Sequence, residues 1–90
     1  MSKAHVDPAE LRRFAADLKR FNTELTSLLA GLNGRLQGLE ASWRDQEQKK
    51  FDEAFRGTVK VFQGFLQESE THASSLNKKA AVIEEYLKQR

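Results

Sequence analysis

Apolar residues recur along the first half of the chain in alternating steps of three and four. They are Leu11, Phe14, Leu18, Phe21, Leu25, Leu28, Leu32 and, after an interruption at Arg35, Leu39. This spacing is typical of a helix that packs along one side in a coiled-coil manner. Asp7, Pro8 and Glu10 form a helix start signal, an acidic form of the reciprocal capping box. The pattern predicts a helix over about residues 7–40.

The same stepping resumes after residue 50 and continues to the end of the chain. It passes through Phe55, Val59, Phe62, Leu66, Ser69, Ala73, Leu76, Ala80, Ile83 and Leu87. Asp45 with Gln48 provides one cap signal and Ser42 another, and the sequence does not decide between them. We therefore predict a turn over about residues 41–45 and a second helix over about 46–88.

Two long helices joined by a short turn must run antiparallel, so the predicted fold is an all-α hairpin in a single domain, residues 1–90. The apolar arc of the second helix is wider than one neighbour can cover, because Val61 and Phe65 extend it around the side. An uncovered stripe of this kind usually marks an interface. We expect the hairpin to dimerise into a four-helix bundle.

The composition excludes several kinds of chemistry. The chain has no cysteine, and its net charge of +2 comes from mixed charges along its length, which argues against nucleic-acid binding. No apolar run is long enough for a stable membrane span. The histidines His5 and His72 lack convincing metal-ligand spacing, and Glu68–His72 is interpreted as a solvated i,i+4 pair. We expect no metal, no cofactor and no catalytic residue.

Two features near and beyond the turn carry alternative interpretations. Trp43, the single tryptophan, either seals the end of the apolar core or forms part of a docking groove. Gly57 and Gly64 lie one heptad apart, so they either are tolerated in a packed helix or permit close helix approach at a dimer contact.

These residues resemble the WXG-motif family, the early-secreted-antigen-like substrates of type VII (ESX) secretion. The motif places Trp-x-Gly at the bend and an aromatic residue eight positions after the tryptophan. Here the bend reads Trp43-Arg44-Asp45, and Phe51 stands eight residues after Trp43. Asp45 replaces the glycine, which is tolerable because aspartate can cap the second helix.

The resemblance also implies a Tyr-x-x-x-Asp/Glu secretion signal near the C-terminus. Tyr86 occupies the tyrosine position, but Arg90 stands where the acid is expected. We therefore regard Tyr86 as a degenerate tail signal and expect export to depend on a partner.

The predicted function is that of a small non-enzymatic hairpin that acts by dimerisation, as a type VII secretion substrate or co-secreted partner. The resemblance implies secretion without a signal peptide, a cytoplasmic pool, and a homodimer or a heterodimer with a similar hairpin; a larger effector and a secretion ATPase are further partners. A cytoplasmic chaperone-like adaptor for a larger effector is the alternative. The side chains assigned to the contact with a second hairpin are Leu25, Leu28, Leu32, Phe55, Val59, Phe62, Phe65 and Leu66.

Overall fold

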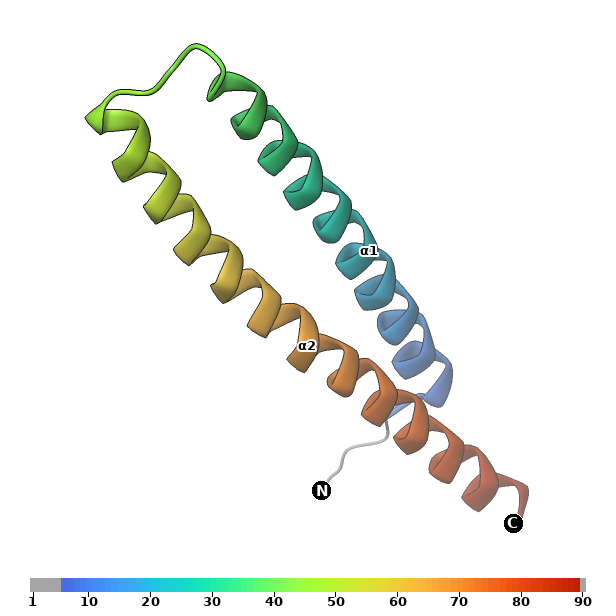
Figure 1. Cartoon of the computed structure of the whole chain (residues 1–90). Helices are drawn as coiled ribbons and strands as arrows, with labels where there is room; N and C mark the ends of the chain where they lie inside the picture. The colour runs from blue at the N-terminus through green and yellow to red at the C-terminus, as the bar shows by residue number, and fades with distance from the viewer. Residues whose placement is uncertain (1–5, 90) are drawn as a thin grey trace.

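A computed structural model describes residues 6–89 as an antiparallel helical hairpin (Figure 1). Helix α1 spans Pro8–Leu39 and helix α2 spans Gln46–Lys88, joined by a turn over residues 40–45. The hairpin is a rod of 68 × 22 × 15 Å, and the end of α2 extends beyond the start of α1 (Figure 1). The two-helix hairpin predicted from the apolar pattern is confirmed, whereas His5 lies outside the described residues.

Both helices begin at an aspartate whose side chain accepts a backbone hydrogen bond. The N–H of Ala9 donates to Asp7 Oδ1 at 2.9 Å, and the N–H of Gln48 donates to Asp45 Oδ1 at 3.0 Å. Asp45, rather than Ser42, is therefore the cap of α2. At α1 the expected reciprocal box is incomplete, because the Asp7 side chain bonds Ala9 instead of the residue three positions on, Glu10.

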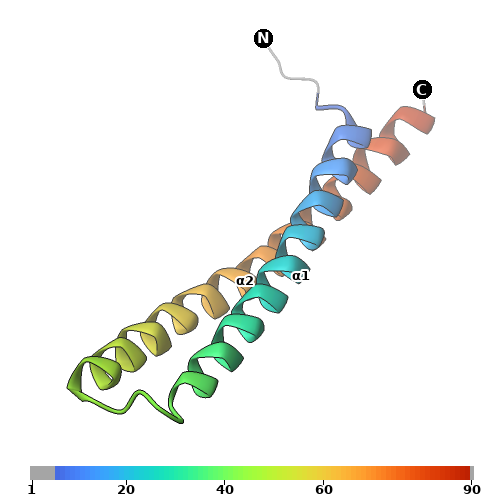
Figure 2. The ribbon, with the colours of Figure 1, turned by 90° about the horizontal axis from the view of Figure 1, so that it is seen from above.

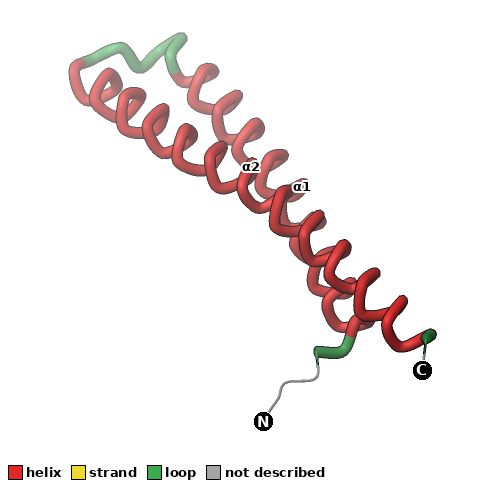
Figure 3. Tube along the Cα trace, turned by 90° about the horizontal axis from the view of Figure 1, so that it is seen from below, coloured by secondary structure: helices red, strands yellow, loops and turns green. Residues whose placement is uncertain are grey.

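The seam between α1 and α2 buries small side chains toward the open end of the hairpin, where the termini lie. Ala15, Ala73 and Ala80 are fully buried there, and their small side chains leave room for the two helices to lie close together. Figures 2 and 3 show the two helices side by side along the rod. Toward the turn, Leu36 and Phe55 are buried in the same seam. Half-buried Leu11, Leu18, Leu25, Leu29, Val59, Phe62, Leu66, Leu76 and Ile83 complete it.

The apolar row predicted for the first helix does not form one seam, and this part of the sequence interpretation is wrong. Leu11, Leu18 and Leu25 face α2, whereas Phe14 and Phe21 remain exposed between them. The physical reason is that steps of three and four alternate between two neighbouring rows, each with a spacing of seven. One facing helix covers only one of those rows.

Polar side chains also lie in the seam. Asn22, Gln48 and Ser69 are buried, and Asn22 Nδ2 donates to Glu70 Oε2 at 3.1 Å. Asn22 Oδ1 and Ser69 Oγ are buried without a hydrogen-bond partner. The seam is therefore a mixed contact and not a fully apolar core.

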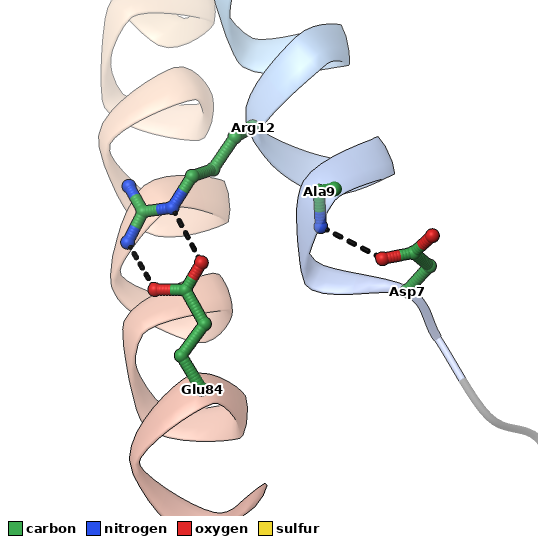
Figure 4. Close-up of polar contacts among 4 residues, drawn as sticks. All are labelled: Asp7, Ala9, Arg12 and Glu84. Atoms are coloured by element: carbon green, nitrogen blue, oxygen red, sulfur yellow. Dashed lines mark hydrogen bonds and ion pairs between the residues drawn. The ribbon is translucent and has the colours of Figure 1, made fainter. Parts of the chain in front are cut away.

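A bidentate ion pair links α1 and α2 at the open end of the hairpin (Figure 4). Arg12 Nε donates to Glu84 Oε2 at 3.0 Å, and Arg12 Nη2 donates to Glu84 Oε1 at 2.7 Å. The planar guanidinium and the carboxylate form two parallel hydrogen bonds, which link α1 and α2 at this end of the hairpin. These hydrogen bonds, together with the charge of Arg12, lower the pKa of Glu84.

The five glycines make no close contact within the hairpin. A Cβ added at Gly31, Gly34, Gly38, Gly57 or Gly64 would meet no atom within 4 Å. Close approach at Gly57 and Gly64 is therefore not a feature of the α1–α2 contact. Within residues 6–89, neither helix is apolar enough over a sufficient length to cross a membrane.

The Arg12–Glu84 pair makes hairpin stability depend on pH. Because the folded-state pKa of Glu84 is lowered, the pair stabilises the fold above the ordinary pKa of glutamate and is lost as the pH falls through the lowered value. Glu84→Gln should therefore lower stability at neutral pH and reduce the loss of stability on acidification. Thermal unfolding followed by circular dichroism across this pH range measures the effect.

The matched control is Glu85→Gln, because Glu85 lies next to Glu84 and forms no ion pair within the described residues. Equal pH profiles for the two variants would contradict the assignment of the pH dependence to Arg12 and Glu84.

Candidate interaction surface

Large apolar side chains are exposed along one side of the hairpin, which we call the open face. Its α1 row and its α2 row are joined where the rings of Phe21 and Phe65 meet edge to face, with centroids 6.2 Å apart. The exposed fractions reach 70% at Leu28 and 72% at Val61. The open face comprises Phe14, Phe21, Leu28, Leu32 and Leu39 of α1 and Phe51, Val61 and Phe65 of α2.

A groove of about 520 Å³ indents the open face toward the open end of the hairpin. Phe14 and Leu18 of α1 and Phe65 and Leu76 of α2 form its apolar walls. His72 and Glu68, interpreted from the sequence as a solvated pair, line the same groove, and so does Lys79. The groove therefore combines apolar side chains from both helices with a few polar groups of α2.

The opposite side of the hairpin has a different character. A groove there is lined by Thr26, Asn33, Arg56, Lys60 and Gln63, around apolar side chains that already belong to the seam. A second hairpin that needs to bury apolar area gains more on the open face than on this polar side.

The residues assigned from the sequence to a second hairpin divide between two places. Leu28, Leu32 and Phe65 lie on the open face. Leu25, Phe55, Val59, Phe62 and Leu66 lie in the α1–α2 seam, where the chain's own helices cover them. Phe55 is only 9% exposed, so the hairpin itself uses this side chain and its assignment is corrected. The other four are half-buried, and their contact with a second hairpin stays a prediction.

The sequence interpretation left five open-face residues out of the contact set: Phe14, Phe21, Leu39, Phe51 and Val61. Phe14, Phe21 and Leu28 are seven residues apart, which is the spacing of a second row on one helix. This seven-residue spacing is the signal that identifies the second row from the sequence. When all the apolar residues of α1 are read as one series of steps of three and four, the second row is not distinguished from the row that faces α2.

Trp43 of the turn and two phenylalanines of α2 form a small aromatic cluster at the closed end of the hairpin. The ring of half-buried Trp43 lies 6.3 Å from that of Phe51, which stacks on Phe55 at the same centroid distance. Phe55 is part of the seam, so the cluster connects the core to the exposed ring of Phe51.

Asp45, at the motif's glycine position, has φ −90° and ψ −173°. Any L-residue adopts this extended conformation, so the replacement of glycine causes no backbone strain.

Tyr86 lies near the C-terminal end of α2, and it is 65% exposed. The ring of Tyr86 is therefore accessible to a protein that recognises this end of the chain. Within residues 6–89, no group of three or more His, Asp or Glu side chains could hold a metal ion.

Comparison with known proteins gives a family match and several structural neighbours. The family model WXG100, described as proteins of 100 residues with WXG, matches residues 3–86. A search of curated protein sequences found no match.

Crystal structures of the secreted protein EsxB from Bacillus anthracis str. Sterne are similar to this chain. The selenomethionine-labelled form is 26% identical with a TM-score of 0.81, and the comparison covers 96% of this chain and 98% of EsxB. The wild-type protein, in space group P21, is 27% identical with a TM-score of 0.77, and the comparison covers 90% of this chain and 87% of EsxB.

The position of Trp43 makes a stability prediction. Trp43→Ala should cost about 2 kcal/mol, less than for a fully buried tryptophan, because the indole is half-buried against Phe51. Chemical denaturation measures the cost, and the emission of the single tryptophan should be blue-shifted in the native state. Solvent-like emission together with unchanged stability would instead assign Trp43 to docking.

Proposed function

This chain belongs to the WXG100 family, and on that premise we propose that it is a non-enzymatic type VII secretion substrate or co-secreted partner that acts by binding another helical hairpin through its open face. The EsxB neighbours are secreted proteins, which supports export of this chain as well.

The observation that carries the proposal is the gathering of exposed apolar side chains on one side of the rod. Monomeric soluble proteins rarely leave apolar side chains contiguous in this way. The rows on both helices form one surface, since Phe21 contacts Phe65 and since Phe14 and Phe65 line one groove. Covering that surface with a second hairpin makes a four-helix bundle.

The seam inside the hairpin supports the same proposal. Buried Asn22 and Ser69 each leave a side-chain oxygen without a hydrogen-bond partner, and each such group costs about 1–3 kcal/mol. A narrow and partly polar seam contributes less to the stability of the hairpin than an apolar seam of the same length. Apolar area buried against a second hairpin therefore makes up a larger share of the total stability.

Two exposed positions of α2 allow a matched test of the open face. Val61 lies on the open face and is 72% exposed, whereas Gln63 lines the groove on the opposite side and is also exposed. Val61→Asp should weaken association at least about tenfold, because it buries a carboxylate against apolar side chains. Gln63→Asp should leave association unchanged.

Size-exclusion chromatography with light scattering measures association, for the chain alone and for the chain co-expressed with a small hairpin from the same genomic locus. Circular dichroism checks that both variants keep their helical content. Equal association of the two variants would contradict binding through the open face.

Export makes a second prediction, because Arg90 stands four residues after Tyr86 where the family signal has an acid. The chain expressed alone in a host with an active type VII system should be exported poorly. Arg90→Glu should raise the amount in the culture medium, and Tyr86→Ala should abolish that gain. Efficient export of the unchanged chain that is insensitive to Tyr86→Ala would mean that a different signal operates.

A further inference from the structure

We propose that the groove on the side opposite the open face is a second docking site, and that it binds a helix of another protein whose apolar stripe carries two carboxylates, one turn apart, along one edge. We call it the polar-side groove: it lies between residues 26–33 of α1 and residues 55–66 of α2 and has a volume of about 440 Å³. This inference goes beyond the proposed function, because it adds a partner that does not use the open face.

The polar-side groove has the shape and length of a site for a helix. Its wall on α2 is about 16 Å long at ~1.5 Å per residue, which equals about three helical turns. Half-buried Leu29 of α1 and half-buried Val59 and Leu66 of α2 line it. Val59 and Leu66 are seven residues apart, the spacing at which a helix presents one row to a neighbouring helix. An amphipathic helix that lies along the groove therefore buries its apolar stripe between α1 and α2.

The charge of the groove favours an acidic partner. Within residues 6–89, the charged side chains that line it are Arg56 and Lys60, both exposed and one helical turn apart on α2. The polar side chains of its other wall, Thr26 and Asn33 of α1, are neutral. A helix that places two carboxylates opposite Arg56 and Lys60 is therefore complementary in charge, and it needs those carboxylates on one edge only.

The contacts around the two cations leave both of them able to bind a carboxylate. Arg56 Nε donates to Asp52 Oδ2 at 2.8 Å, and this contact orients the guanidinium. The two Nη groups of Arg56 form no hydrogen bond within residues 6–89, so both are available as donors. Lys60 forms no ion pair in the same part of the chain. The groove therefore offers one uncompensated positive charge at Lys60 and two donor groups at Arg56.

The cationic stretch is short, and its length limits the kind of partner that it fits. The adjacent groove nearer the turn is lined by charged side chains of both signs, namely Glu40, Arg44, Lys49, Asp52 and Glu53. A nucleic acid carries a negative charge at every nucleotide and needs cations along a longer path. A helix with one pair of carboxylates matches a cationic stretch of one turn, so we assign the groove to a protein segment.

The two sides of the rod therefore favour different partners. The groove of the open face is lined by Glu68 as well as by Lys79, so an acidic pair meets a like charge there. The exposed side chains of Leu28 and Val61 on the open face do not line the polar-side groove. Because the two surfaces lie on opposite sides, a hairpin on the open face and a helix in the polar-side groove can bind at the same time.

Two fluorescently labelled helical peptides test the charge preference on the intact chain. Each is about 18 residues long, with leucines in alternating steps of three and four for the apolar stripe and one charged pair, one turn apart, along its edge. The pair is Glu–Glu in one peptide and Lys–Lys in the other. Fluorescence anisotropy should show that the chain binds the Glu peptide roughly tenfold more tightly. Arg56→Glu combined with Lys60→Glu should reverse this preference, which a loss of structure does not do.

Two single variants locate the bound peptide and separate this inference from the proposed function. Gln63→Asp places a carboxylate among the residues of the polar-side groove and should weaken binding of the Glu peptide, whereas Val61→Asp on the open face should leave it unchanged. Equal affinity for the two peptides, or binding that Val61→Asp abolishes, overturns the inference and leaves the proposed function standing. A retained preference for the Glu peptide in a chain that pairs with no hairpin supports the inference and defeats the proposed function.

Discussion

Two helices that lie side by side can bury only the stripe of side chains that each turns toward the other, and the architecture of this protein depends on that limit. Helix α1 carries two adjacent apolar rows, and α2 covers the one that contains Leu18 and Leu25. The other row, with Phe14 and Phe21, stays at the surface. The open face is thus a direct consequence of a sequence that is more apolar than a lone hairpin requires.

The choice between the two rows follows from the small and polar residues that interrupt the buried one. Ala15, Ala73 and Ala80 are fully buried, so they allow the helices to approach where larger groups would hold them apart. Arg12 and Glu84 add two hydrogen bonds between the helices at the open end. With the seam set in this way, the rotation of each helix is fixed, and so is the side on which Phe21 and Phe65 meet.

These interactions also explain what could be predicted from the sequence. Period, caps and turn residues are local signals, so the two helices and the cap at Asp45 follow from neighbouring residues. Contacts between residues far apart in the sequence decide which apolar row of α1 faces α2. A search for the spacing of large apolar residues does not count the alanine and asparagine side chains that lie in the seam. Ala15 and Asn22 follow Leu11 and Leu18 by four residues each, a heptad pattern that is visible only when small and polar members are counted.

The proposed pairing has a consequence for the tail. Tyr86 is exposed near the end of α2 and has Arg90 at the fourth position after it. On the proposed function, a second copy of this chain would carry the same Tyr86 and Arg90 and would add no acid, whereas a different hairpin with an acid at that position would supply one. Pairing through the open face and recognition of the tail can therefore be tested separately, because the first depends on Val61 and the second on Tyr86 and Arg90.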